Sequence, residues 1–158
     1  MKQLKKIIYI FGLITILITL KSCGGSYESE NREELSSAFE DLFHFNPPNS
    51  IEEIKVKNWA HYDTQMYWMS FSYNFNVIKR ILSKDQQLKI TFKNSNEFNQ
   101  ITEFIKQNTH NPKWLNLPNE STNQIYYKKD FIENTSLSVF YIWSDTKSGK
   151  TYLYIHSY

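Results

Sequence analysis

The chain contains a single cysteine, Cys23, at the point where an uncharged apolar run ends and a polar stretch begins. A lone thiol can be a free nucleophile, half of an intermolecular disulfide, or an attachment point. A reactive thiol needs an electropositive environment that stabilises the thiolate, whereas Cys23 is followed by the acidic stretch GGSYESENREE. An internal disulfide would need a second cysteine. We therefore expect Cys23 to be an attachment point.

The segment before Cys23 has the features of a secretory signal. Lys2, Lys5 and Lys6 form a positive amino-terminal region, and residues 7–20 follow without a charge. As a helix this run would span only about 21 Å, against about 30 Å for the hydrocarbon core of a bilayer. The apolar region of a signal peptide has this shorter length. We expect residues 1–22 to be a signal peptide and not a permanent transmembrane helix.

The sequence LKSC at residues 20–23 resembles the lipobox of bacterial lipoproteins, with a leucine, a small residue and then the cysteine. Lys21 departs from the pattern, because a small or uncharged residue usually occupies that position. In that family signal peptidase II cleaves before the cysteine, which becomes the acylated first residue. The resemblance implies lipidation of Cys23 and attachment to a membrane of the bacterial cell envelope. Two or three acyl chains would hold the domain there, since each buried methylene contributes about 0.8 kcal/mol of membrane affinity.

The composition after the signal peptide argues against nucleic-acid binding and against several enzyme classes. Residues 23–158 carry 14 basic and 16 acidic side chains, whereas nucleic-acid affinity depends on a clustered basic surface. After Gly25 the only glycine is Gly149, which excludes a Walker loop and a dinucleotide-binding turn. The sequence also lacks the His-Glu-x-x-His motif and any cysteine cluster for zinc. We expect no metal, no cofactor and no enzymatic activity.

His61 and Asp63, in the sequence AHYDT, could in principle bind a metal or act as an acid–base pair. A metal or catalytic site would require a third group, and none accompanies them in the sequence. They lie between two predicted strands, where histidine and aspartate are common turn residues. We interpret both as residues of a turn.

Aromatic side chains are the remaining candidates for a binding site, because residues 23–158 include 24 Phe, Tyr and Trp residues. Residues 136–158 are predicted to form a hairpin with Gly149 in its turn. Strand alternation gives this hairpin one apolar face, formed by Phe140, Ile142, Leu153 and Ile155. The opposite face is aromatic and comprises Tyr141, Trp143, Tyr152 and Tyr154, together with His156 and Tyr158.

Two interpretations of this aromatic face are possible. If exposed, it would suit a protein interface or stacking against sugars, since tyrosine and tryptophan are enriched at binding surfaces. If covered by the first helix, it would be ordinary core. Trp114, in a loop that contains Pro112 and Pro118, is a second candidate for an exposed anchor; the alternative is that it packs over the edge of the sheet.

The elements that would position these residues follow from hydrophobic spacing. Helical periodicity predicts helices over residues 31–45, 76–83 and 94–108, with Asn31 and Glu34, and Asn94 and Glu97, as capping pairs. Alternation predicts strands over residues 51–59, 66–75, 88–92 and 125–131, besides the two arms of the hairpin. Residues 23–31 are expected to be the acylated cysteine and a flexible tether. Residues 32–158 are expected to form one α+β domain, with a largely antiparallel sheet and about three helices mainly on one face.

The plan of this domain resembles that of small uncharacterised bacterial lipoproteins: an early helix, a Pro-Pro break, an aromatic strand, a Pro-x-Trp loop and a terminal aromatic hairpin. That resemblance implies a fold and no activity. We expect a membrane-anchored envelope lipoprotein whose domain is a non-enzymatic module that binds a protein partner, of the assembly or immunity type. The alternative is a surface accessory that binds a glycan through the aromatic face.

Overall fold

The computed structural model describes residues 24–29, 31–85, 87–132 and 136–158. The predicted signal peptide and Cys23 lie outside the described residues. The helices are α2 (Arg32–Phe43), α3 (Phe75–Lys84) and α4 (Asn96–Lys106). The strands are β1 (Gly24–Ser29), β2 (Lys55–His61), β3 (Thr64–Ser72), β4 (Lys89–Phe92), β5 (Gln124–Ile132), β6 (Ser136–Asp145) and β7 (Lys150–Ser157).

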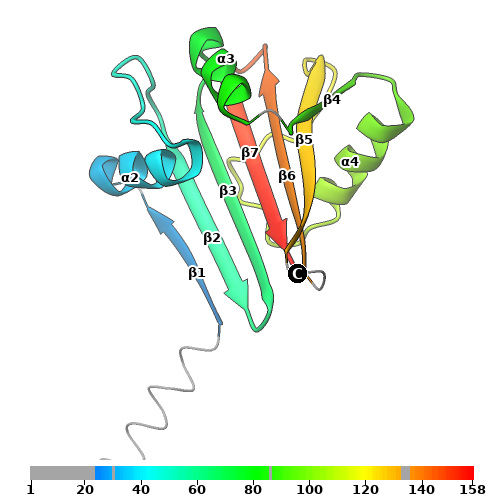
Figure 1. Cartoon of the computed structure of the whole chain (residues 1–158), viewed down its shortest axis with the longest axis horizontal. Coiled ribbons are helices and arrows are strands. Elements are labelled where there is room, and N and C mark those ends of the chain that lie inside the picture. Colours follow the sequence, from blue (N-terminus) through cyan, green and yellow to red (C-terminus); the bar gives the residue numbers. More distant parts are fainter. Residues whose placement is uncertain (1–23, 30, 86, 133–135) are drawn as a thin grey trace, which may run out of the picture.

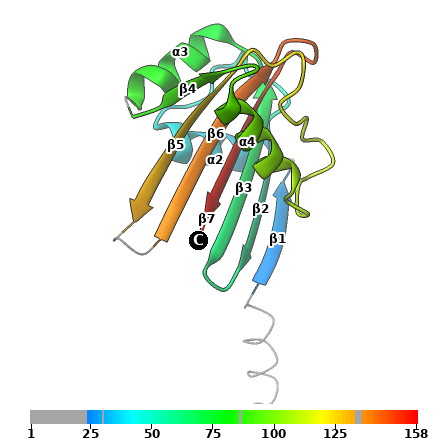
Figure 2. The same ribbon diagram turned by 90° about the vertical axis from the view of Figure 1, so that its right-hand side faces the viewer.

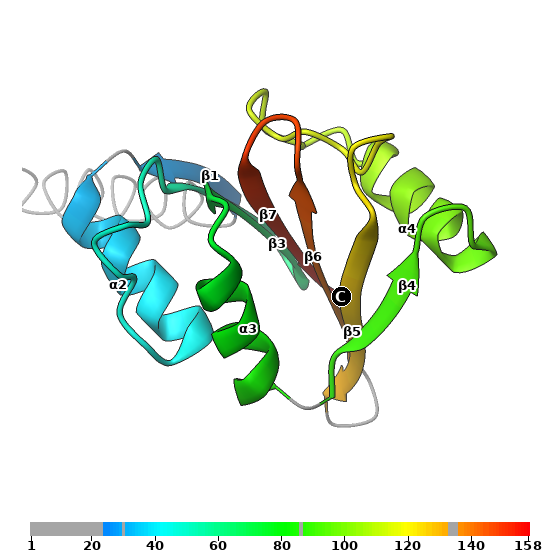
Figure 3. The ribbon, with the colours of Figure 1, turned by 90° about the horizontal axis from the view of Figure 1, so that it is seen from above.

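All the described strands belong to one sheet with the order β1-β2-β3-β7-β6-β5-β4, in which every neighbouring pair is antiparallel (Figure 1). The predicted class, a single α+β domain with a largely antiparallel sheet, is confirmed. Helices α2 and α3 cover one face of the sheet and α4 lies against the other (Figure 3). Two of the three helices therefore share a face, and the sheet is the middle layer of three.

The face under α2 and α3 is packed with aliphatic and phenyl side chains. Phe39 of α2 is fully buried and meets Phe71 of β3 edge-to-face, with ring centroids 5.4 Å apart. Leu153 of β7, also fully buried, lies in the same cluster. Burying a side chain of this size contributes about 1.5–3 kcal/mol to folding, so this face holds α2 and α3 on the sheet.

The face under α4 carries the larger aromatic side chains. Phe98, Ile101 and Ile105 follow helical spacing and form the buried side of α4. Trp68 of β3 is fully buried in this cluster, although its sequence neighbour Met69 is fully buried in the other one. Because both faces are covered, the central strands bury consecutive residues instead of alternating between core and solvent.

Residues 24–29 form strand β1, so the prediction of a flexible tether over this stretch is wrong. All six residues pair with β2, from Gly24 opposite His61 to Ser29 opposite Val56. The stretch is poor in apolar residues because an outer strand is held chiefly by backbone hydrogen bonds and need not bury side chains. Glu34 of α2 adds to this attachment, since its carboxylate accepts hydrogen bonds from the hydroxyls of Ser29 and Tyr27.

The helix starts differ in part from the predicted caps. Asn31 is the N-cap of α2 as expected, with its side chain accepting from the amide of Glu33 at 2.9 Å. Glu34 binds β1 and does not close a capping box. The N-cap of α4 is Ser95 and not Asn94, because the Ser95 hydroxyl accepts from the Phe98 amide at 3.1 Å. Asn94 takes a left-handed conformation, with φ of 71°.

Candidate functional site

The aromatic face of the terminal hairpin is core, so the interpretation of Tyr141, Trp143, Tyr152 and Tyr154 as an exposed binding face is wrong. These four side chains are between 0 and 3% exposed. The covering elements are α4 and the loop that follows it, on the opposite side of the sheet from the first helix α2. Their polar atoms are used internally: the Trp143 indole donates to the carbonyl of Asn116 at 3.0 Å.

Trp114 packs over the edge of the sheet. It is partly buried against the aromatic cluster, and its indole N–H donates to the carboxylate of Glu28 on β1. The side chain therefore ties the loop after α4 to the outer strand. Of the two interpretations of Trp114, packing at the edge agrees with its position.

His61 and Asp63 are both exposed: His61 is the last residue of β2, and Asp63 lies in the turn between β2 and β3. The His61 ring stacks on Trp59 with centroids 5.8 Å apart, and Asp63 accepts from the hydroxyl of its neighbour Thr64 at 3.4 Å. Among the described residues no group of three histidine, cysteine, aspartate or glutamate side chains could hold a metal ion. Their geometry agrees with residues in or next to a turn.

Exposed apolar side chains gather at a different place, beside helix α3. Seven large hydrophobic residues are exposed in the described part of the chain, and four of them surround the N-terminal end of α3 and strand β4: Tyr73, Phe75, Ile90 and Phe92. Phe75 is 66% exposed and Phe92 is 58% exposed. Exposed apolar patches on soluble proteins mark interaction sites more often than scattered single residues do.

A groove of about 380 Å³ lies within this patch. One wall is the side of α3 that carries Phe75, Ile78, Lys79 and Leu82, which recur at helical spacing. The other wall comes from β5, β6 and the residues next to them, and comprises Asn123, Gln124, Tyr126, Ser144 and Thr146. The groove therefore runs along one side of α3, between the helix and the sheet.

Strand β4 extends this groove to the edge of the sheet. Ile90 is paired with Tyr126, and Phe92 is paired with Gln124. Cross-strand partners point to the same face of a sheet, so Ile90 and Phe92 lie on the side that faces the groove. Strand β4 is the outermost strand of the sheet (Figure 1), so exposed apolar side chains are present from the start of α3 to this edge.

The polar side chains that line the groove are neutral, except for Lys79. Burial, with a contribution from Tyr73, raises the pKa of Tyr126, although a hydrogen bond from Gln124 acts in the opposite direction. The Tyr126 hydroxyl therefore stays protonated at neutral pH. Lys79 is the one charged side chain among the residues that line the groove. The groove offers apolar area, a few hydrogen-bonding groups and one positive charge.

A second, larger cleft of about 680 Å³ opens on the other side of α3. It lies between the C-terminal ends of α2 and α3 and strands β5, β6 and β7. Apolar side chains form its walls: Leu42, Phe43, Ile81, Leu88, Phe140 and Ile155. Its polar lining residues are His44, Lys84, Asp85, Gln87, Lys128, Asp130 and Ser138.

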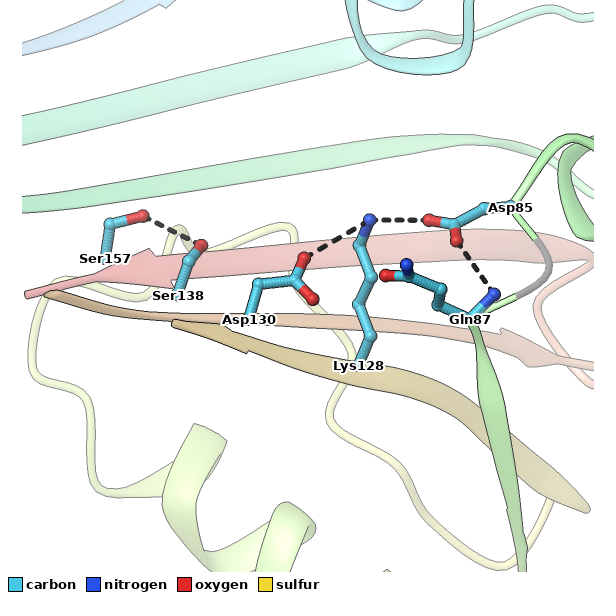
Figure 4. A network of polar contacts seen from close by, with 6 residues as sticks. All are labelled: Asp85, Gln87, Lys128, Asp130, Ser138 and Ser157. Carbon is cyan, nitrogen blue, oxygen red and sulfur yellow. Dashed lines mark hydrogen bonds and ion pairs between the residues drawn. The ribbon is translucent and has the colours of Figure 1, made fainter. Parts of the chain in front are cut away.

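Lys128 pairs with two acidic side chains of this cleft, Asp85 and Asp130 (Figure 4). Its ammonium lies 2.6 Å from the carboxylate of Asp85 and 3.5 Å from that of Asp130. Burial would lower the pKa of Lys128, but the two carboxylates outweigh burial and the pKa is raised. A lysine that stays protonated supplies charge and not a nucleophile. The contact with Asp85 ties β5 to the end of α3, which gives this network a structural role.

Comparison with known proteins gives no relative from which a function could be transferred: no family model, no curated protein and no solved structure matches this chain. None of the helices in residues 24–158, as far as the structure describes them, is long and apolar enough to cross a membrane. The geometry of the domain and the pattern around Cys23 are therefore the basis for a functional proposal.

The groove beside α3 was not predicted from the sequence. Alternation predicted a strand over residues 66–75, with Phe75 at its end. In the structure Phe75 is the first residue of α3, because the Asn74 side chain accepts from the amides of Asn76 and Val77 and so caps the helix. An asparagine before an apolar helical pattern is an N-cap signal, and it could have placed Phe75 outside the strand.

Proposed function

We propose that this chain is a lipid-anchored protein of the bacterial cell envelope, attached through Cys23, and that its domain is a non-enzymatic module that binds a protein partner. The observation that carries the second part is the clustering of Tyr73, Phe75, Ile90 and Phe92 around the groove beside α3. The first part is supported by the charged, apolar and LKSC segments that end at Cys23.

The chemistry of the groove favours a protein partner. Phe75 lines the groove, and the exposed Phe92 is paired with Gln124 of the opposite wall. Large aromatic side chains dominate the energetics of protein interfaces. Lys79, Gln124 and Ser144 provide polar groups around the apolar area, as in the rim of an interface. The glycan alternative relied on a row of exposed hairpin aromatics, and those rings are buried.

The polar groups near α3 support binding and not catalysis. Ser144 is hydrogen-bonded to Thr151 at 3.0 Å, and Tyr126 to Gln124. Lys128 in the neighbouring cleft is paired with two carboxylates and stays protonated. Each of these groups already has a hydrogen-bond or ion-pair partner within the domain. We therefore assign them a structural role beside the binding surface.

Photo-crosslinking in cells tests the partner surface. With p-benzoylphenylalanine at position 75, irradiation should convert part of the protein into a discrete crosslinked species that contains a second protein. The matched control is the same probe at position 62, because Tyr62 is also an exposed aromatic residue but lies at the opposite end of the sheet.

The substitution Phe92→Ala should reduce the crosslink from position 75 at least fivefold, because Phe92 is an exposed residue paired with Gln124, which lines the groove together with Phe75. Tyr62→Ala should leave that crosslink unchanged. An equal yield of the same species from positions 75 and 62, or a crosslink that survives Phe92→Ala at full strength, would contradict the proposed surface.

A further inference from the structure

We infer that the turn between β2 and β3, with Tyr62 at its tip, lies against the lipid surface, so that the sheet stands on the membrane with its strands pointing away from it. This inference rests on the proposed attachment through Cys23. It concerns a part of the domain far from the groove beside α3, and the partner that it names is a bilayer surface.

In the sequence no residue separates Cys23 from strand β1. Gly24 follows Cys23 directly in the sequence and is the first residue of β1. Gly24 is paired with His61, the last residue of β2. Neighbouring strands lie about 4.8 Å apart. The start of β1 and the β2–β3 turn therefore share one end of the sheet (Figure 2).

Acylation of Cys23 would fix the depth of the start of β1 relative to the bilayer. Acyl chains on Cys23 would lie in the hydrocarbon region, so the backbone at Cys23 would sit at headgroup level. Gly24 is one peptide unit, about 3.8 Å, further along the chain. The polar interfacial region on each side of a bilayer is roughly 5–7 Å thick. Gly24 and its partner His61 are then held within or just above this region, and the turn beyond His61 reaches it.

The chemistry of the turn also supports this orientation. Tyr62 is 80% exposed, the largest fraction among the exposed apolar residues of the described chain. Its φ of 52° lies in the left-handed region, which is unusual for a bulky side chain. A tyrosine combines an apolar ring with a polar hydroxyl and is enriched at membrane–water interfaces. His61 and Asp63 beside it are polar, which suits headgroup depth and not deeper insertion.

The orientation places the groove away from the lipid. Strand β3 starts at Thr64 beside the turn and has nine residues, which corresponds to a length of about 30 Å. Tyr73 and Phe75 follow its far end, and Phe92 lies opposite the first residue of β5 at that same end (Figure 1). One end of the sheet thus faces the membrane while the other displays the exposed aromatic patch.

Fluorescence quenching in vesicles tests this orientation. An acylated Cys23 cannot react with a thiol probe, so the full-length lipidated chain with Tyr62→Cys can be labelled with bimane at position 62 alone. The matched control is Ser148→Cys in the exposed turn between β6 and β7, at the opposite end of the sheet. Each protein is reconstituted into phosphatidylethanolamine–phosphatidylglycerol vesicles, with and without lipids brominated near the interface. Bromolipid should lower the emission at position 62 at least twofold and change the emission at position 148 by less than a tenth.

A third protein carries eight glycine and serine residues between Cys23 and Gly24 in addition to Tyr62→Cys. This insertion should abolish the quenching at position 62 while the palmitate label and vesicle binding persist. Quenching that survives the insertion would overturn the orientation alone. So would a palmitate-labelled Tyr62→Cys protein without the insertion that shows no quenching at position 62. A full-length protein that takes up no palmitate would overturn the proposed attachment, and the orientation with it.

Discussion

Trp143 and Phe75 are both large aromatic residues, but they occupy opposite extremes of exposure. Trp143 is 1% exposed beneath α4, whereas Phe75 projects into solvent beside the groove. Removing a buried indole leaves a cavity, and substitutions of this kind cost about 3–5 kcal/mol. We therefore expect Trp143→Ala to lower the free energy of unfolding by that amount, and Phe75→Ala to change it by no more than about 0.5 kcal/mol.

Urea melts of the two variants at pH 7 measure both values. If Trp143→Ala hardly changed the free energy of unfolding, the aromatic face would not be core. The hairpin would then again be a candidate binding surface. A large loss of stability in Phe75→Ala would mean that Phe75 is a packing residue, and would remove the main residue of the proposed partner surface.

Asp145 is a buried carboxylate at the end of β6, just before the turn to β7, and its hydrogen bonds make the stability of the fold sensitive to acid. Burial would raise its pKa, but bonds from the Ser121 hydroxyl and from the turn amides outweigh burial and lower the pKa of Asp145 to about 2. Relative to the ordinary value of 3.8, this corresponds to about 2 kcal/mol of stability. That stability is present above the ordinary pKa and is lost as the pH falls through about 2.

We expect Asp145→Asn to lower the free energy of unfolding by about 2 kcal/mol at pH 7, because the asparagine lacks the charge that the turn amides stabilise. The difference from the unmodified protein should shrink as the pH is lowered from 5 to 2. Urea melts across this range measure it, with Asp63→Asn as the control at an exposed turn. A penalty that is independent of pH would show that the carboxylate charge of Asp145 contributes nothing.

At the scale of elements, β1 is the strand on which the proposed orientation at the membrane depends. Its six residues pair with β2, and Trp114 and Glu34 contact it through side chains. Amides in a paired strand exchange with solvent only when the strand opens. We expect about half of the β1 amides, those directed at β2, to exchange at least tenfold more slowly than in the denatured chain. Hydrogen exchange read by mass spectrometry on the full-length protein measures this rate. If residues 24–29 exchanged as fast as in the denatured chain, they would be a flexible tether and not a strand.

The elements that hydrophobic spacing could predict are those whose side chains alternate between two environments. Residues 66–75 and the terminal hairpin were predicted as strands because apolar and aromatic side chains repeat there with a period of two. Strand β1 was missed because backbone pairing holds it, and Gly, Ser and Glu give no such pattern. Phe75 was misassigned because the strand pattern of β3 continues to it across the helix cap at Asn74.

The covering of the hairpin could not be predicted for a different reason. Periodicity identified both faces, with Phe140 and Leu153 on one and Trp143 and Tyr152 on the other. It cannot show which helix packs on which face, because that depends on how the chain crosses the sheet. Helix α4 returns on the side opposite to α2, so both faces are buried, and the exposed patch lies beside α3 instead.

At the scale of the whole molecule, the two ends of the sheet have different proposed roles. The end that holds Gly24 and Tyr62 is proposed to stand at the lipid surface, and the end that holds Phe75 and Phe92 to meet a protein partner. The antiparallel pairing of β1, β2 and β3 separates them by about 30 Å, the length of nine strand residues. A partner could then approach the groove without contacting the bilayer.

The assignment of the membrane-facing end depends on the acylation of Cys23. The most direct measurement compares the unmodified chain with Cys23→Ser in bacteria fed a palmitate analogue, followed by membrane fractionation. We predict that the unmodified protein takes up the label and sediments with membranes at the size of residues 23–158. We predict that Cys23→Ser takes up no label and either stays at full length or leaves the membrane fraction. A Cys23→Ser protein that remains firmly membrane-bound at the mature size would contradict the proposed attachment through Cys23.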